Sequence, residues 1–396
     1  MFIYIICLVL WADRPVMART GKTEILIGAH LPLSGLGSLV GAEQKWAYLK
    51  AVEDINKAGG IYVRQYRRKL PVRLIMIDDE SDPIKVAGAV ERLILEYKVD
   101  LLLSGQVGVM GVLPGMMTAE KYHKYYHGTV IWVPDFLKYN FQWCTMYFIH
   151  IEDTARMPFE IWNSLPKYQR PHKPALFMED STDGRQLCQG LEAFAEKYGY
   201  EIALQTFLPM GSEDFSAQIL RAKSIGVDAV ILFTNVPEAV TLVRQMKEMN
   251  FDVKFLQGFK GTWAIEFYQA LKKNSDYILC DGFWSMDYPF KGAKKLGRSY
   301  YKEFRKRSVG IGMYYALCQT LWKAIEKAGT LDSAKVRQAV LDNEFDTVNG
   351  RVDYDERGIA LFPLADLQWY KGKRHIVYPF EYSKLDVKIA PKWNER

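Results

Sequence analysis

Short apolar runs alternate along the chain with apolar stripes at helical spacing, in an order that occurs twice. In the first half, Ile25 to Leu31 forms a continuous apolar run, and Tyr48, Ala51, Val52 and Ile55 recur at i, i+3, i+4 and i+7. Strands are expected there at residues 25–31, 72–77, 101–103 and 129–133, and helices after residues 41 and 82 and over residues 112–124. In the second half, strands are expected at residues 175–179, 202–207, 228–233 and 253–257, with helices between them. This repeated alternation predicts an α/β protein with two parallel sheets covered by helices.

The loops that follow these strands are rich in Gly, Ser, Asp and Pro. In open α/β sheets, ligands bind outside the carboxyl ends of the strands, so these loops are the candidate binding region. The same residue types also form ordinary turns, and that alternative stands for each loop taken singly. The loops are residues 34–41, 78–82, 105–111, 134–137, 180–184, 234–237 and 258–263.

Composition indicates a globular protein of two domains and argues against a nucleic-acid-binding protein. A chain of 396 residues suggests two domains, and 49% hydrophobic with 25% charged residues is typical of a globular protein. The 52 Lys and Arg against 46 Asp and Glu give a net charge of +6, spread along the chain. A dispersed excess argues against a nucleic-acid partner and suits a small anionic ligand.

The first residues read as an export signal. The apolar run at residues 2–11 is shorter than the roughly 20 residues that span a bilayer, and small residues at 16–18 resemble a cleavage site. Residues 1–18 are therefore expected to be a signal peptide, although no Lys or Arg follows Met1. The remainder is expected to be soluble and extracytoplasmic. Export would permit disulfides, but apolar surroundings favour four buried free thiols at Cys144, Cys188, Cys280 and Cys318.

Five stretches together resemble a known family, and the similarity covers roughly residues 24–373. The chain resembles the type I periplasmic solute-binding proteins, specifically the branched-chain amino-acid (Leu/Ile/Val) receptors of ABC transporters. The stretches that carry the resemblance are ILIGAHLPLSGLGSLVGAEQKWAYLKAVEDINKAGGI, DDESDPIKV, ALFMEDSTDGRQLCQGLEAFAEKYG, FLPMGSEDFSAQILRAKSIGVDAVILF and GRVDYDERGIALFPLADLQWYKGK.

The resemblance implies two Rossmann-like lobes joined by a three-crossing hinge. The expected first lobe is residues 24–148 plus 285–355, and the second is 149–284 plus 356–396. Ligand would sit between the lobes, and hinge closure would present the closed form to a membrane permease. The resemblance also implies a monomer without enzymatic activity, cofactor or metal.

The resemblance further implies which loops of the first lobe contact ligand. Val40, in the same loop as Ser38, matches a position where the family often has an aromatic cap. Val109 and Met110 match a serine-rich loop that holds a ligand carboxylate, but here only backbone N–H groups could serve. Asp135 and Phe136 match an Ala/Thr loop. Ser81 and Gly108 match a family cysteine pair, so that disulfide is not expected.

In the second lobe, the residues that match the family's ligand contacts differ from the family in charge. Asp183 and Asn235 match family tyrosines, and Lys260 matches the acidic residue that binds a ligand ammonium. A buried cation facing an ammonium would cost several kcal/mol. We therefore expect a small carboxylate ligand, an aromatic acid among the candidates, with Lys260 on the anion and Trp263 and Trp284 on the apolar body. A branched-chain amino acid or amide remains the alternative, with Asp135 or Asp183 as the replacement acid.

The sequence also offers weaker signals for two other classes of function. A dinucleotide-binding enzyme is suggested faintly by Gly35, Gly37 and Gly41 after the first strand, but the spacing departs from G-x-G-x-x-G. Asp78, Asp79 and the pair His123 and His127 could suggest a metal, but no third ligand or known zinc motif accompanies them. A ligand-sensing domain of a signalling system is the second alternative, because the same fold serves receptors that signal.

Overall fold

The computed structural model describes residues 21–35, 37–105 and 109–396. The expected signal peptide at residues 1–18 and the expected ligand loop residue Gly108 lie outside the described residues. Within the described ranges, no helix combines the length and the apolar character needed to cross a membrane.

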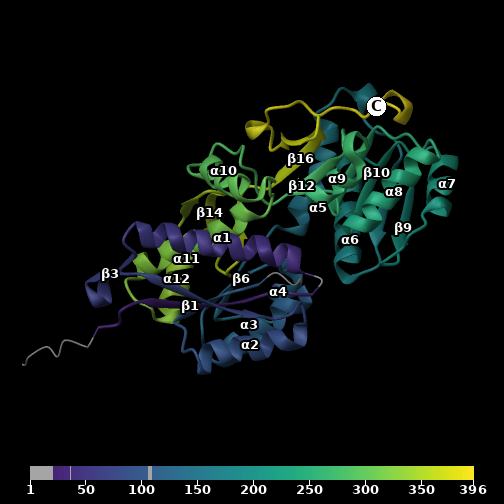
Figure 1. The fold of residues 1–396 in the computed structure, drawn as a ribbon. Coiled ribbons are helices and arrows are strands. Elements are labelled where there is room, and N and C mark those ends of the chain that lie inside the picture. Colours follow the sequence, from purple (N-terminus) through teal and green to yellow (C-terminus); the bar gives the residue numbers. More distant parts are fainter. Residues whose placement is uncertain (1–20, 36, 106–108) are drawn as a thin grey trace, which may run out of the picture.

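A five-stranded, fully parallel sheet with helices on both faces forms what we call the first lobe (Figure 1). Helix α1 lies on one face, and helices α2 and α3 pack together on the other. The strand order is β4 (Val72–Asp78), β1 (Ile25–Leu31), β5 (Leu101–Leu103), β6 (Tyr126–Thr129), β7 (Cys144–Tyr147). The other elements of this stretch are α1 (Ser38–Lys57), β2 (Ile61–Val63), β3 (Arg68–Leu70), α2 (Pro83–Leu95), α3 (Val109–Lys121) and α4 (Val133–Leu137).

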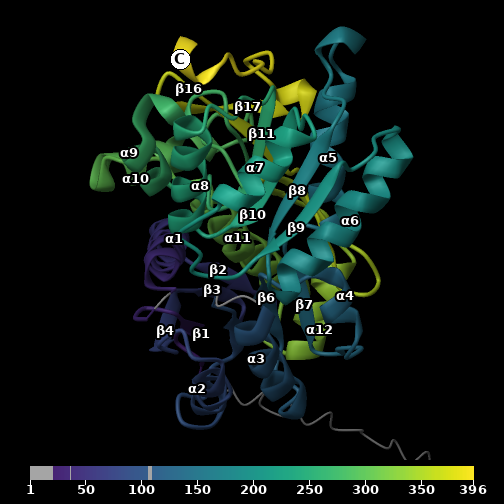
Figure 2. The same ribbon diagram turned by 90° about the vertical axis from the view of Figure 1, so that its right-hand side faces the viewer.

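A seven-stranded sheet with its helices forms the second lobe, which Figure 2 shows above the first. Helix α5 packs against α6, and α8 packs against α7 and α9. The strand order is β17 (Lys373–Tyr378), β16 (Ala365–Tyr370), β12 (Leu279–Gly282), β11 (Phe255–Lys260), β10 (Ala229–Thr234), β8 (Pro174–Glu179), β9 (Leu204–Leu208). The helices are α5 (Ile151–Asn163), α6 (Thr182–Tyr198), α7 (Ser216–Ser224), α8 (Val236–Glu248) and α9 (Ile265–Leu271).

The chain passes between the lobes three times. It enters the second lobe after β7, leaves it after β12, and returns to it at β16. The segment between β12 and β16 packs on the first lobe, since α11 contacts α1 and β15 contacts β7. Its elements are α10 (Ala293–Phe304), α11 (Ile311–Ala328), α12 (Ser333–Leu341), β13 (Phe345–Thr347), β14 (Gly350–Tyr354) and β15 (Ala360–Leu361). The α/β fold class is confirmed, and the residue boundaries expected for the two lobes stay a prediction.

Local sequence accounts for where several elements begin. The Asp82 side chain accepts a hydrogen bond from the Ile84 N–H, and Pro83 opens α2, as its N-cap pattern predicted. The predicted strand at residues 129–133 was wrong. Strand β6 ends at Thr129, Val130 has φ +57°, and Pro134 lies in the first turn of α4, where a proline favours a helix start.

The second sheet is not wholly parallel, contrary to expectation. Strands β16 and β17 run antiparallel to each other, and β16 runs antiparallel to β12. Only Lys371 and Gly372 join β16 to β17, and a connection this short can link antiparallel strands but not parallel ones. The four cysteines in the described ranges, Cys144, Cys188, Cys280 and Cys318, are buried and free, as predicted.

Candidate functional site

A cavity of about 720 Å³ lies between the two lobes, at the carboxyl ends of β10 and β11. The first lobe contributes the start of α1, and the second contributes the start of α8, the loop after β11, and β17. The segment at residues 306–309, which joins α10 to α11, closes one side. Its polar and charged lining residues include Glu43, Asn235, Lys260, Trp263, Ser308 and Arg374. Its apolar walls include Leu39, Val40, Val236, Val240, Ile265 and Val309.

Four residues expected at a ligand site from the sequence meet in this cavity: Val40, Asn235, Lys260 and Trp263. Ser38 begins α1 two residues before the lining residue Val40 and is itself outside the lining. These positions come from both lobes and are far apart in the sequence. The cavity therefore has the position expected for a ligand held between the lobes.

Lys260 does not stand free to bind an anion. Its Nζ lies 2.9 and 3.0 Å from the two carboxylate oxygens of Glu179, and the Asn235 amide donates to the same carboxylate at 2.9 Å. Glu179 is buried, whereas the Lys260 side chain is 34% exposed. The charge expected to hold a ligand carboxylate is thus already matched by a protein carboxylate.

Glu179 is the site residue that sequence reasoning missed. It ends β8, while Asn235 follows β10 and Lys260 ends β11, and these three parallel strands are neighbours in the sheet. Parallel register places their carboxyl ends at one edge, so strand order would have brought the acid beside the lysine. The sequence alone does not give strand order.

Removal of one partner of this ion pair should destabilise the fold. Lys260→Met leaves a buried carboxylate with Asn235 as its remaining donor, and we expect a loss of about 1–3 kcal/mol in the free energy of unfolding. The lower part of the range reflects solvent screening at Lys260. Urea denaturation measures the loss.

The matched control is the double variant Lys260→Met/Glu179→Gln, which removes both charges. We expect it to be more stable than Lys260→Met alone, because no uncompensated charge remains buried. If the loss of stability in the double variant equals the sum of the losses in Lys260→Met and Glu179→Gln measured singly, the pair contributes no coupling energy.

The two tryptophans favoured from the sequence have different environments. Trp263 lines the cavity, packs edge-on against Phe283 at 4.8 Å between ring centroids, and its buried Nε1 has no hydrogen-bond partner among the described residues. Trp284 is fully buried, and its Nε1 donates to the Val348 carbonyl at 2.9 Å. Trp284 belongs to the packed core beneath α11 and not to the cavity lining.

The acidic candidates Asp135 and Asp183 lie where α4 of the first lobe meets α6 of the second. The Trp132 indole donates to Asp183 at 3.1 Å, and the Gln186 amide donates to Asp135 at 3.1 Å. Asp135 also pairs with Lys138 at 2.7 Å. Desolvation raises the pKa of Asp183, against the opposing effect of Lys260. These contacts join the lobes, and neither carboxylate lines the cavity.

The remaining candidates have diverse positions. Phe136 is buried and packs against Phe141 at 5.5 Å, so its environment is the core of the first lobe. Val109 and Met110 begin α3, and their side chains lie outside the described residues.

Glu43, which was not singled out from the sequence, is partly buried in the cavity wall. There it accepts hydrogen bonds from Ser308 at 2.5 Å and Tyr300 at 3.1 Å. Desolvation raises the pKa of Glu43.

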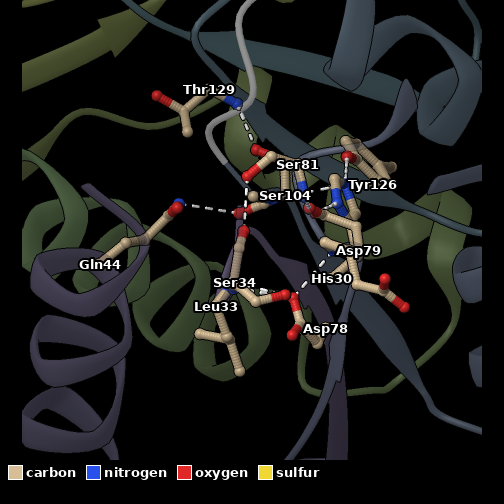
Figure 3. Close-up of polar contacts among 12 residues, drawn as sticks. His30, Leu33, Ser34, Gln44, Asp78, Asp79, Ser81, Ser104, Tyr126 and Thr129 are labelled. Atoms are coloured by element: carbon tan, nitrogen blue, oxygen red, sulfur yellow. Dashed lines mark hydrogen bonds and ion pairs between the residues drawn. The ribbon is translucent and has the colours of Figure 1, made fainter. Parts of the chain in front are cut away.

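A buried polar network orders the loops at the edge of the first lobe (Figure 3). His30 Nδ1 lies 2.8 Å from Asp79, and its Nε2 lies 2.6 Å from the Tyr126 hydroxyl and 3.3 Å from the Gly105 N–H. Because the Gly105 N–H can only donate, we assign the proton to Nδ1. The Asp78 carboxylate accepts from the N–H groups of Leu33 and Ser34. This network joins Leu33 and Ser34 after β1, the end of β4 and Gly105 after β5.

Asp78 and Asp79, two candidate metal ligands in the sequence, form hydrogen bonds within this network. His127, also considered, is buried, and its Nδ1 lies 2.8 Å from both Tyr125 and Thr145. No group of three or more His, Cys, Asp or Glu able to hold a metal occurs in the part of the chain that the structure describes.

Comparison with known proteins gives a consistent match. The periplasmic binding protein family matches residues 24–373. A leucine-, isoleucine-, valine-, threonine- and alanine-binding protein of Pseudomonas aeruginosa is 24% identical over 348 residues, covering 86% of this chain and 88% of the relative. A Leu/Ile/Val-binding protein homologue of Brucella abortus is 24% identical over 368 residues, covering 88% and 91%.

Solved structures share the fold. A leucine-binding protein of Thermotoga maritima superposes with a TM-score of 0.75 at 19% identity, covering 89% of this chain and 97% of the other. A solute-binding protein of an ABC transporter from Rhodopseudomonas palustris, in complex with 3,4-dihydroxybenzoic acid, superposes with a TM-score of 0.74 at 17% identity, covering 93% and 98%.

Proposed function

The chain belongs to the periplasmic binding protein family, and from that premise we propose that it is the extracytoplasmic receptor of an ABC transporter. It captures a small organic carboxylate or an amino-acid-like molecule in the cavity between its lobes. Closure of the lobes around the ligand then presents the loaded receptor to the membrane permease. The receptor acts as a monomer and does not transform its ligand.

The observation that carries this proposal is the position and lining of the cavity. It opens at the carboxyl ends of two parallel strands, between two separately packed lobes, where α/β proteins bind small molecules. Apolar side chains from α1 and α8 form its walls, and a few charged groups converge on it. Such a lining suits a ligand with an apolar body and one polar end.

Two ligand classes are compatible with this lining. The similar proteins from Pseudomonas and Brucella are named for aliphatic amino acids, and the similar structure from Rhodopseudomonas holds an aromatic acid. An amino acid needs an acceptor for its ammonium, and the Glu179 carboxylate beside the cavity is committed to Lys260. The cavity lining holds the carboxylates of Glu43 and Glu266 against five Lys and Arg side chains, and this positive excess favours a carboxylate without an amino group. The alternative is a branched-chain amino acid or amide, with Glu266 of the cavity lining as acceptor in place of Asp135 or Asp183, or a sensing role in a signalling system.

A thermal-shift screen of residues 19–396 tests the function directly. We expect aliphatic or aromatic carboxylates, or amino acids, to raise the melting temperature, because a ligand at 100 times its Kd adds about 2.7 kcal/mol to the free energy of unfolding. Neutral sugars serve as the control. After a hit, the recovered ligand should be chemically unchanged. Stabilisation by none of these classes, or turnover of a hit, would contradict a receptor role.

A further inference from the structure

Arg374 is a buried cation in the cavity wall. Arg374 belongs to strand β17, and only 7% of its surface is exposed. Its Nη1 donates to the Trp263 carbonyl, and its Nη2 donates to the Arg307 carbonyl at 2.6 Å. Its guanidinium also lies over the Trp369 ring, 5.0 Å from the centroid. Both of these hydrogen bonds go to neutral carbonyl groups.

Two other cations of the cavity lining have a carboxylate partner, whereas Arg244 and Lys306 form no ion pair within the described residues but are more exposed than Arg374. Lys260 pairs with Glu179, and Arg307 pairs with Asp287 at 3.1 Å. Within the described residues, no carboxylate forms an ion pair with Arg374. Glu43 and Glu266, which both line the cavity, are close enough to act electrostatically on Arg374 without an ion pair, and the two oxygens of Glu43 accept from Ser308 and Tyr300.

This arrangement leaves some N–H donors of the Arg374 guanidinium without an acceptor. A guanidinium carries five N–H donors in a planar fork that matches a carboxylate, and two carbonyls do not use them all. A buried charge without a counter-ion is costly, and desolvation lowers the pKa of Arg374 accordingly. A ligand anion in the cavity would supply the missing charge.

Trp263 adds a second donor beside the first. Its carbonyl accepts from Arg374, so the two residues are in direct contact, and both line the cavity. The Trp263 Nε1 is buried without an acceptor in the described part of the chain, and an indole nitrogen can only donate. The spare N–H groups of Arg374 and the unpartnered indole N–H of Trp263 together form a donor set that is complementary to an oxyanion.

We propose that Arg374 and the Trp263 indole N–H bind the carboxylate of the ligand, and that Lys260 does not. The inference rests on the proposed receptor function and specifies which end of the cavity takes the anion. The apolar side chains of Leu39, Val40 and Val240 then face the ligand body. Arg374 also contacts the segment that leads into α11 through the Arg307 carbonyl, so the anion would sit at a junction between the lobes.

The test compares matched ligands and matched variants by isothermal titration calorimetry. The probes are benzoate and isovalerate, each paired with its uncharged amide, benzamide and isovaleramide. Wild-type protein should bind the carboxylates more tightly than the amides. Arg374→Gln should weaken carboxylate binding by about 10- to 100-fold, the range expected for a charge-assisted hydrogen bond, and leave amide binding nearly unchanged.

Three further variants protect the test against a folding defect. Trp263→Phe removes one N–H and keeps an aromatic ring, and it should weaken the carboxylates by a smaller factor. The double variant Lys260→Met/Glu179→Gln removes the rival cation of the cavity together with its partner, and it should weaken the carboxylates less than Arg374→Gln does. The control, Arg156→Gln, removes a cation that pairs with Asp153 outside the cavity lining, and it should leave carboxylate affinity close to wild type. Circular dichroism confirms that each variant is folded at the titration temperature.

The outcomes separate the two proposals. Unchanged carboxylate affinity in Arg374→Gln and Trp263→Phe, binding of the amides alone, or loss of carboxylate binding only in the Lys260 and Glu179 double variant overturns the assignment of Arg374. Each of these results leaves the receptor function intact. Failure of wild-type protein to bind any carboxylate, amide or amino acid overturns the receptor function and the inference with it.

Discussion

Trp284→Ala should lower the free energy of unfolding by about 3–5 kcal/mol, the range observed when a buried aromatic side chain is deleted. The indole is fully buried, and its Nε1 donates to the Val348 carbonyl. It fits so tightly under α11 that a Cβ added at Gly312 would lie 2.1 Å from the ring. Deletion therefore leaves a cavity and a buried carbonyl that has lost its donor. Urea denaturation of wild type and variant measures the difference.

Trp263→Ala is the matched control, because it removes the same side chain from the cavity lining. It should cost less stability than Trp284→Ala and should weaken binding of the tightest carboxylate found in the screen. Trp284→Ala should bind that ligand with nearly wild-type affinity below its unfolding transition. If the affinities followed the opposite order, Trp284 would be a ligand contact and the core assignment would fail.

The two tryptophans show what a sequence can and cannot resolve at this site. Both follow strands near the expected cleft, and both were equally plausible from the sequence. Their difference depends on Gly312 and Val348, which follow Trp284 in the chain by tens of residues and pack against it only after α11 folds back on the first lobe. Sequence position predicts which loop a residue joins, but contacts made across the fold decide which side of the loop it faces.

The fold itself was largely predictable, because it depends on local patterns. The buried strand Ile25–Leu31 and the capped start of α2 at Asp82 are encoded by neighbouring residues. The errors are also local in origin. Strand β7 (Cys144–Tyr147) was not predicted, since four residues give little periodicity.

The charges of the site were less predictable than its position. Lys260 was correctly located at the end of a strand, but its partner Glu179 lies 81 positions earlier and becomes a neighbour only through strand order. Arg374 attracted no notice, because it lies in a closing strand beyond the loops expected to bind ligand. Strands β16 and β17 bring it to the cavity only because they add to the edge of the second sheet. Long-range pairing thus determines which cation has a partner.

A pair of buried aspartates predicts an unusual pH dependence of stability. Asp281 on β12 and Asp366 on β16 are direct cross-strand partners. Burial raises the pKa of Asp281 to about 7 and that of Asp366 to about 8, and the neighbouring charge of Asp281 adds to the effect on Asp366. The Gln257 amide donates to Asp366 at 3.3 Å, which opposes the shift only in part.

The sign follows from the difference between the folded and unfolded states. Both aspartates have a pKa near 3.8 when unfolded, so between pH 4 and 8 the folded state holds protons that the unfolded state has lost. The free energy of unfolding therefore falls as the pH rises through this window, by at most about 1.4 kcal/mol per pH unit for each group. Their contribution is fully present below pH 4 and is lost by about pH 8.

Asp366→Asn should remove much of this dependence, because an amide has the same shape and no proton to lose. At pH 8 the variant should be more stable than wild type by about 2–4 kcal/mol, whereas at pH 4 the two should be nearly equal. Urea denaturation at intervals between pH 4 and 8 gives both curves. Asp183→Asn, which changes a carboxyl that is only partly buried, is the control and should follow the wild-type curve more closely. Parallel curves for wild type and Asp366→Asn would show that Asp366 is ionised in the folded protein throughout this range.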